Sequence, residues 1–184
     1  MMIWRKSYLN QCQKYLEGYM KLEIRHAKNS DIKEINNIYN FYIKETPYTF
    51  DIKKKSLKEK ELWFKKFKKI GSTICIVGCK GEEIIGFASS ANFREKEAYQ
   101  NSIESSVYIK KEYIGKGYGK LLMMELIDLL KESKARRIYA LITYPNKSSV
   151  VLHKSLGFKM VGKLNDVGLK FDKYWNVEIY ELKI

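Results

Sequence analysis

Three glycines stand where a phosphate-binding loop would lie. Gly115, Gly117 and Gly119 separate a strand-like segment from a strongly apolar helical segment. Glycines allow successive backbone N–H groups to converge on an anion, and the positive end of the following helix adds to the attraction. Lys116 and Lys120 add charge beside the loop. The spacing therefore predicts a site for a phosphate-bearing ligand.

Two common phosphate-binding motifs do not fit this loop. The dinucleotide fingerprint G-x-G-x-x-G needs its third glycine one residue after Gly119, and an acidic residue at the end of the next strand. The Walker motif needs its second glycine five positions after the first and then K-[ST], whereas Gly119 is four positions after Gly115 and Leu121 follows the lysine. Glycines are also common in ordinary turns between a strand and a helix, so the loop alone leaves open both its role and its ligand.

The composition is typical of a folded enzyme-sized domain. The 184 residues are 45% hydrophobic and 14% aromatic, which excludes a disordered chain. No segment approaches the roughly 20 apolar residues that cross a bilayer, and the N-terminus lacks the apolar core of a signal peptide. The three cysteines have no zinc-type spacing. These patterns predict a cytoplasmic protein with reduced cysteines, no metal and no membrane partner.

The net charge of +14 raises the alternative of nucleic-acid binding. The lysines are spread along the whole chain, and no recognition motif accompanies them. Runs such as "KKFKK" (65–69) fall on an expected amphipathic helix, where they form a solvated face. We therefore do not expect nucleic acid to be the partner.

The elements that must position the loop alternate along the chain. The hydrophobic periodicity and the turn residues predict an α+β fold, with a mixed, mostly antiparallel sheet and helices on both faces. Expected strands cover 21–27, two segments within 72–93, then 102–110, 137–144, 158–166 and 173–183; expected helices cover 31–45, 56–69, the segment from the glycine loop to 133, and 145–156.

The N-terminal segment, 1–19, fits this order poorly. It forms either an N-terminal helix or a translated leader before a biological start at Met20, and the sequence leaves both open. The single expected domain covers 20–184.

Five linked motifs resemble the GNAT superfamily of N-acetyltransferases and, within it, the phosphinothricin-type amino-acid acetyltransferases. The resemblance covers roughly 20–182 and implies a homodimer and a sheet whose middle strands splay apart. The motifs are "TPYTFD" (46–51), "FREKEAYQNSIESSVYI" (93–109), "GKGYGK" (115–120), "PNKSSVVLHKSLGF" (145–158) and "VGLKFDKYW" (167–175).

The resemblance implies acetyl-CoA as the phosphate-bearing molecule. The glycine loop would hold its pyrophosphate, and the splayed strand would bond its pantetheine arm as an added strand does. A backbone N–H near Val107 or Tyr108 would polarise the thioester carbonyl. Asn146 would bond the pantetheine, cap the following helix, or do both. The implied cofactor-binding residues are Val107, Tyr108, Ile109, Gly115, Lys116, Gly117, Tyr118, Gly119, Lys120 and Asn146.

The resemblance also implies two catalytic residues. Glu104 matches the family's catalytic glutamate, which as a partly buried carboxylate would take the proton of the acceptor ammonium; its plain alternative is a glutamate at a strand end. His153 stands where the phosphinothricin group has a histidine, and would protonate the leaving thiolate or relay a proton. Its plain alternative is a packed histidine bonded to a backbone carbonyl.

The acceptor pocket is assigned by the same resemblance to Arg94, Tyr99 and Phe50. Arg94 would hold a substrate carboxylate by two parallel bonds. Ordinary packing is the alternative for Phe50 and its neighbour Tyr48. The chain departs from the family pattern in three places. Ile114 removes one contact on the phosphate side, for which Lys116 would compensate, and the changes at Tyr174 and Asn176 bear on acceptor identity more than on the fold or the cofactor.

These residues lead to one principal hypothesis and two alternatives. The principal one is an acetyl-CoA-dependent N-acetyltransferase acting on the α-amine of a small amino acid or analogue, of the phosphinothricin, methionine sulfoximine or methionine sulfone type. The first alternative is acetylation of a protein or peptide amine. The second is a non-catalytic module that binds CoA or nucleic acid.

Overall fold

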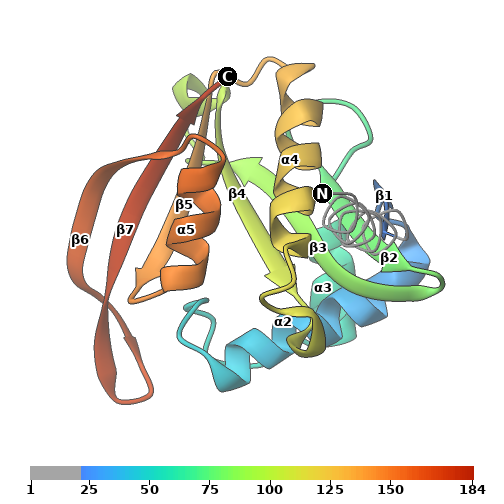
Figure 1. Cartoon of the computed structure of the whole chain (residues 1–184), viewed down its shortest axis with the longest axis horizontal. Coiled ribbons are helices and arrows are strands. Elements are labelled where there is room, and N and C mark those ends of the chain that lie inside the picture. Colours follow the sequence, from blue (N-terminus) through green and yellow to red (C-terminus); the bar gives the residue numbers. More distant parts are fainter. Residues whose placement is uncertain (1–21) are drawn as a thin grey trace, which may run out of the picture.

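One seven-stranded sheet organises the computed structural model, which describes residues 22–184 (Figure 1). The strand order is β1-β2-β3-β4-β5-β7-β6, and neighbours are antiparallel except for the parallel pair β4–β5. The predicted α+β fold with a mixed, mostly antiparallel sheet is confirmed. The predictions about residues 1–19 lie outside the described residues. The main elements are β1 (Leu22–His26), α2 (Ile32–Glu45), α3 (Leu57–Phe64), β2 (Cys75–Lys80), β3 (Glu83–Asn92), β4 (Ser102–Ile109), α4 (Tyr118–Lys131), β5 (Arg137–Tyr144), α5 (Lys147–Ser155), β6 (Lys159–Lys170) and β7 (Lys173–Lys183).

The predicted helix over 56–69 is shorter than expected. Its start is correct, because Ser56 and Glu59 form a capping box in which each side chain bonds the other residue's backbone N–H. It ends at Phe64, after which the chain tightens into a turn where Phe67 N–H donates to the Phe64 carbonyl. This turn packs the ring of Phe67 against Trp63, with 4.5 Å between ring centroids. Trp63, Phe64 and Phe67 all pack against the core cluster under α2.

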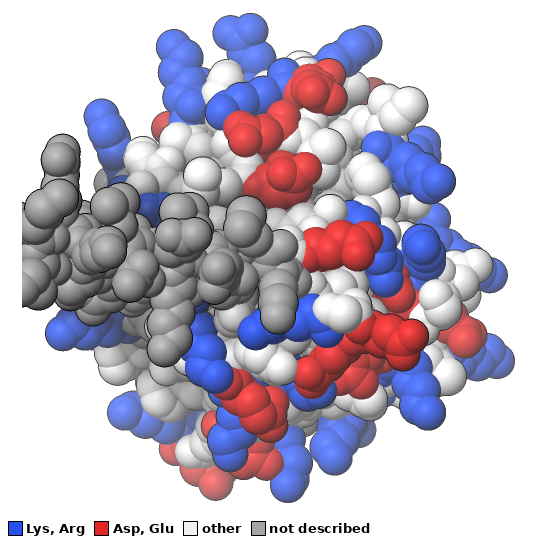
Figure 2. Space-filling view, turned by 45° about the vertical axis from the view of Figure 1, so that its right-hand side comes forward, with Lys and Arg blue, Asp and Glu red and all other residues white. Residues whose placement is uncertain are grey.

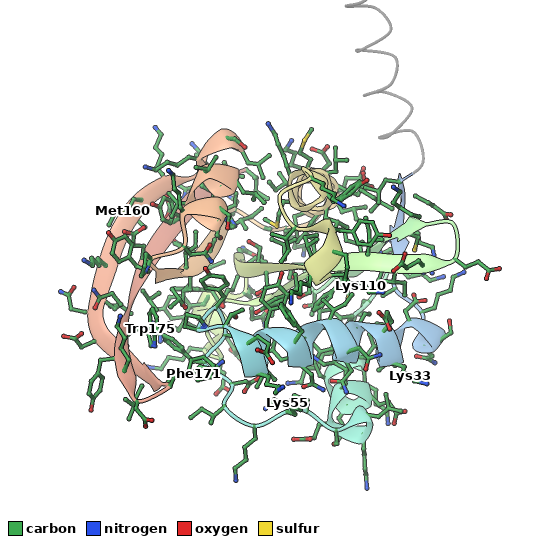
Figure 3. All side chains as sticks on the ribbon, turned by 60° about the horizontal axis from the view of Figure 1, so that its bottom comes forward. Lys33, Lys55, Lys110, Met160, Phe171 and Trp175 are labelled. Carbon is green, nitrogen blue, oxygen red and sulfur yellow. The ribbon has the colours of Figure 1, made fainter. Side chains whose placement is uncertain are left out.

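The helices cover both faces of the sheet. α4 and α5 lie on one face, and α2 and α3 lie on the other (Figures 1 and 3). Alternate residues of a strand point to opposite faces, so β2 serves both layers. Ile76 belongs to the core cluster under α4, whereas Cys75 and Val77 belong to the cluster under α2.

The two central strands, β4 and β5, part soon after they begin. Their pairing is limited to Ser102–Glu104 against Arg137–Tyr139. Beyond that point β4 continues beside β3 alone, and β5 continues beside β7 alone. The splayed middle strands expected from the sequence are therefore present.

The parting exposes backbone groups in an alternating pattern. The Ser102 carbonyl accepts the Phe93 N–H, and the Lys110 N–H donates to the Ile85 carbonyl, so even-numbered residues of β4 bond the β3 side. The N–H and C=O of one strand residue face the same neighbour. Val107 therefore directs both groups toward the gap.

The structure shows the surroundings of some charged residues and of two cysteines. On the face seen in Figure 2, Lys and Arg side chains alternate with groups of Asp and Glu. Cys75 and Cys79 are buried and free, and burial raises the pKa of the Cys75 thiol to about 12. Within residues 22–184, no helix has the length and hydropathy to cross a membrane, and no group of His, Cys, Asp and Glu could hold a metal ion.

Candidate active site

The gap between β4 and β5 opens into a groove of about 850 Å³ that α4 and α5 also line. This volume is typical of a small-molecule site. The groove gathers most of the residues that the sequence assigns to a phosphate-bearing ligand. Those lining it are Val107, Tyr108, Ile109, Gly115, Gly117, Tyr118, Gly119, Lys120 and Asn146, together with His153.

The glycine loop has the backbone of an anion-binding turn. Gly115 and Gly117 have φ of 79° and 86°, in the left-handed region that favours glycine, and Gly117 is the N-cap of α4. The backbone N–H groups of residues 115–119 have no acceptor within the described part of the chain. Gly119 lies so close to α5 that an added Cβ would stand 3.0 Å from Leu152. The loop thus presents free donors at the positive end of α4.

Tyr42 of α2 closes one end of the gap. Its hydroxyl donates to the Ile109 carbonyl at 2.7 Å and accepts the Ile109 N–H at 3.2 Å. One side chain thus satisfies the two backbone groups that a neighbouring strand would otherwise bond. Among the described residues, no side chain bonds the N–H or C=O of Val107 in this way. Sequence reasoning missed this role, because Tyr42 fits the apolar spacing of its helix and nothing in the pattern signals its hydroxyl.

α5 positions two of the predicted residues: Asn146 is its N-cap, and His153 lies in its last turn. Asn146 caps the helix, its Oδ1 accepting the Ser149 N–H at 3.2 Å and the Ser148 hydroxyl at 3.0 Å. Both bonds use Oδ1, so the amide nitrogen is available to a ligand in the groove.

His153 is buried within the groove wall. Its Nδ1 lies 2.8 Å from the Ser149 carbonyl, which assigns the proton to Nδ1, and its ring meets Phe158 edge to face at 5.0 Å. Its Nε2 is buried without a hydrogen-bond partner among the described residues. Burial lowers the pKa of His153, against the opposing effect of the Ser149 carbonyl. The neutral form of the ring is therefore favoured, and in this form Nε2 can accept a hydrogen bond.

The Glu104 side chain lies on the face of β4 that is opposite to α5 and His153. It stands at the last paired position, beside Ala91 of β3 and Tyr139 of β5. Burial raises the pKa of its carboxyl, and the positive charge of Arg94 opposes that rise. Phe93 stacks on Tyr139 with centroids 4.3 Å apart. Glu104 and Arg94 thus share one region, while Glu104 and His153 are separated by the strand.

Two predicted residues lie outside both regions. Lys116 does not line the groove, and its ammonium lies 5.2 Å from the centroid of the Tyr113 ring. Tyr99 is 42% exposed and lies edge-on to Phe93.

Phe50 belongs to a junction between the loop after α2 and the β6–β7 hairpin. Its ring lies against Gly168, where an added Cβ would collide with it. The Lys170 ammonium donates to the Thr49 carbonyl at 2.7 Å, and the Trp175 indole N–H donates to the Lys170 carbonyl at 2.9 Å. Figure 3 shows Phe171 and Trp175 beside this loop. The hairpin thereby fixes the loop that carries Phe50.

The three departures from the expected motif pattern have distinct surroundings. Ile114 lines the groove and is 47% exposed, so an apolar side chain stands next to the glycine loop. Tyr174 is exposed on β7. The Asn176 side-chain oxygen accepts the Asp166 N–H at 2.7 Å, at a point where β6 has a left-handed residue.

Comparison with known proteins agrees with this geometry. A family model described as "Acetyltransferase (GNAT) domain" matches residues 24–178. A phosphinothricin N-acetyltransferase of Streptomyces coelicolor is 36% identical over 90% of this chain and 98% of its own. An L-methionine sulfoximine/L-methionine sulfone acetyltransferase of Pseudomonas paraeruginosa is 28% identical over 90% of this chain and 96% of its own. The crystal structure of a phosphinothricin acetyltransferase (Pat) from Sinorhizobium meliloti in complex with AcCoA is similar at 27% identity, with a TM-score of 0.85 and 89% of each chain covered.

The burial of His153 predicts a specific dependence of stability on pH. Its pKa is lowered in the folded state, so the unfolded chain binds the proton first as the pH falls. At a pH above the pKa of histidine in the unfolded chain, about 6.5, burial of the neutral ring does not lower the free energy of unfolding. As the pH falls below that value, the unfolded chain gains a proton and the free energy of unfolding decreases. The free energy of unfolding of the wild type, relative to His153→Gln, should fall by up to about 1.4 kcal/mol per pH unit there. Denaturant titrations of both proteins from pH 7 to 5 measure this difference.

Nitrogen NMR of the imidazole provides a direct check. At pH 7 the ring of His153 should carry one proton, on Nδ1. A doubly protonated ring at that pH would contradict the assignment.

Proposed function

Because this chain belongs to the GNAT family of acetyltransferases, we propose that it transfers an acetyl group from acetyl-CoA to the α-amine of a small amino acid or analogue. We take the acceptor type from the names of its relatives, which are acetyltransferases of phosphinothricin, methionine sulfoximine and methionine sulfone. The observation that carries the proposal is the position of β4. The backbone groups of its odd-numbered residues face the groove, which suits the donor, while Glu104 does not line that groove.

The groove has features suited to binding a ligand that carries a diphosphate and a polar arm. Free N–H groups of the glycine loop and the Lys120 ammonium suit the diphosphate. The unpaired backbone groups of Val107 suit an extended amide chain, which they would bond as an added strand. Acetyl-CoA, when bound, supplies an acetyl group activated as a thioester. The Val107 N–H would polarise the carbonyl of that group.

Glu104 acts as the general base. Transfer needs a neutral amine, and a carboxylate whose pKa is raised by burial accepts the ammonium proton more readily than an exposed one. Arg94, whose charge acts on Glu104, is suited to the carboxylate of the acceptor. This pair would hold an α-amino acid by both of its charged groups.

His153 accepts a hydrogen bond in the groove that would hold acetyl-CoA. Its unpartnered Nε2 would receive a hydrogen bond from an N–H or S–H group in the groove. A role as the initial proton donor would require the charged ring, which burial disfavours.

An acceptor panel tests the proposed activity. Release of free thiol from acetyl-CoA should be seen with phosphinothricin, methionine sulfoximine or methionine sulfone, and should be much weaker with peptides. Turnover of peptides alone would favour the protein acetyltransferase. Tight acetyl-CoA binding without turnover of any amine would favour the non-catalytic module.

Glu104→Gln should lower kcat by about 10²–10⁴-fold, because the general base is lost while the strand is kept. In the wild type, the rate should fall as the pH drops through the raised pKa of Glu104, and this acidic limb should vanish in the variant. Steady-state kinetics against pH measure both effects. The control is Glu125→Gln, the same charge change at an exposed position of α4. A wild-type pH profile in Glu104→Gln would remove Glu104 from the mechanism.

We also propose a homodimer through β6. This strand ends the sheet and carries a series of exposed apolar side chains, which are Met160, Val161, Leu164, Val167 and Leu169. Apolar edge strands favour pairing with another chain. Light scattering should give twice the 21.8 kDa chain mass, and Val167→Glu should shift it toward the monomer. Met124→Glu, on exposed α4 surface, should not, and a monomeric wild type would contradict the proposal.

A further inference from the structure

A second cavity, of about 320 Å³, lies on the α2–α3 side of the sheet. We call it the Lys60 pocket; its polar floor and aromatic walls are formed by Tyr39, Lys60, Trp63, Ser89, Ser106 and Tyr108. Ser106 and Tyr108 also line the groove between β4 and β5. The Lys60 pocket therefore adjoins the groove and has no place in the function described so far.

Lys60 is a buried cation without a charged partner. Its side chain is 4% exposed, and its ammonium lies 3.9 Å from the centroid of the Tyr39 ring and 4.2 Å from that of Trp63. No carboxylate within residues 22–184 approaches it within ion-pair distance, and no hydrogen bond from it is formed there. Lysine is rarely buried unless it is paired.

The carboxylates around the pocket are already engaged. Asp51 accepts the Tyr39 hydroxyl at 2.7 Å and the Lys55 ammonium at 3.0 Å. Glu59 accepts both donors of Ser56 in the capping box. Burial lowers the pKa of Lys60 to about 8, while the charge of Asp51 opposes the change. The two aromatic rings offset only part of the cost of burying the ammonium.

Two serine hydroxyls converge on the same space. Ser89 and Ser106 are paired across β3 and β4, and both line the pocket. The side chains of these two serines form no hydrogen bond within the described chain. An ammonium and two hydroxyls, set among aromatic rings, suit an oxygen-bearing anionic or strongly polar group on a short apolar stem.

The position of Glu104 sets the distance from this pocket to the reacting amine. Glu104 and Ser106 are two residues apart on β4 and point to the same face, so they are separated by about 6.6 Å along the strand. A side chain of a few bonds spans that length. We propose that the Lys60 pocket binds the distal oxo group of the acceptor, a phosphinate or sulfonyl oxygen, while the amine lies at Glu104. This inference rests on the proposed function and names the determinant of its acceptor specificity.

Paired acceptors test the assignment in the intact enzyme. Phosphinothricin carries a distal phosphinate, and norleucine has a similar chain without an oxo group. Lys60→Met should lower kcat/KM for phosphinothricin at least tenfold, mainly through KM, and should leave that for norleucine within twofold. Lys58→Met removes the same charge from an exposed position of α3 and should change neither. Equal losses for both acceptors, or none for phosphinothricin, would overturn the proposal.

A binding measurement separates this inference from the activity itself. Phosphinothricin should shift the Lys60 side-chain carbon resonance in the wild type and raise the pKa of its ammonium, whereas norleucine should do neither. If phosphinothricin does so in a protein that acetylates no amino acid, the pocket stands and the proposed function fails. An unmoved Lys60 resonance at saturating phosphinothricin would overturn the pocket.

Discussion

The loss of hydrogen bonding between β4 and β5 is the constraint on which the rest of the structure depends. A parallel pair that continued past Glu104 would satisfy every backbone group, and it would leave no groove. Because the strands part, α4 and α5 line an open space, and the backbone groups of Val107 have no partner among residues 22–184. The Tyr42 hydroxyl satisfies Ile109 at one end of the gap. The sheet is thus kept intact around a break that a ligand can fill.

A single strand separates the two halves of the chemistry. The groove proposed for the donor lies along β4 from Ser105 to Ile109, whereas Glu104, the proposed general base, lies before it on the same strand and does not line it. The short pairing at Ser102–Glu104 fixes Glu104 at the point where the gap begins. A group held in the gap would therefore reach the carboxylate only at that point.

Burial sets the charge of each polar group in the region. It raises the pKa of Glu104, which favours the uptake of a proton, and lowers the pKa of His153, which favours a neutral ring. It also lowers the pKa of Lys60, yet that ammonium is held by two aromatic rings. These three residues come from different elements, so their protonation is a property of how the elements pack.

Most of the secondary structure of this protein could be predicted from its sequence alone. Periodicity and turn residues predicted nearly every strand and helix, because alternation and helical spacing are local properties of the chain. The glycine spacing indicated a loop with left-handed residues before α4, since positive φ at Gly115 and Gly117 favours glycine. The early end of α3 at Phe64 was not predicted, because the capping box marks where a helix starts and no comparable signal marks its end here. Tertiary structure alone decided which face of β4 each side chain occupies, the use of the Tyr42 hydroxyl, and the burial of Lys60. These properties arise from contacts between residues far apart in sequence, which local pattern does not encode.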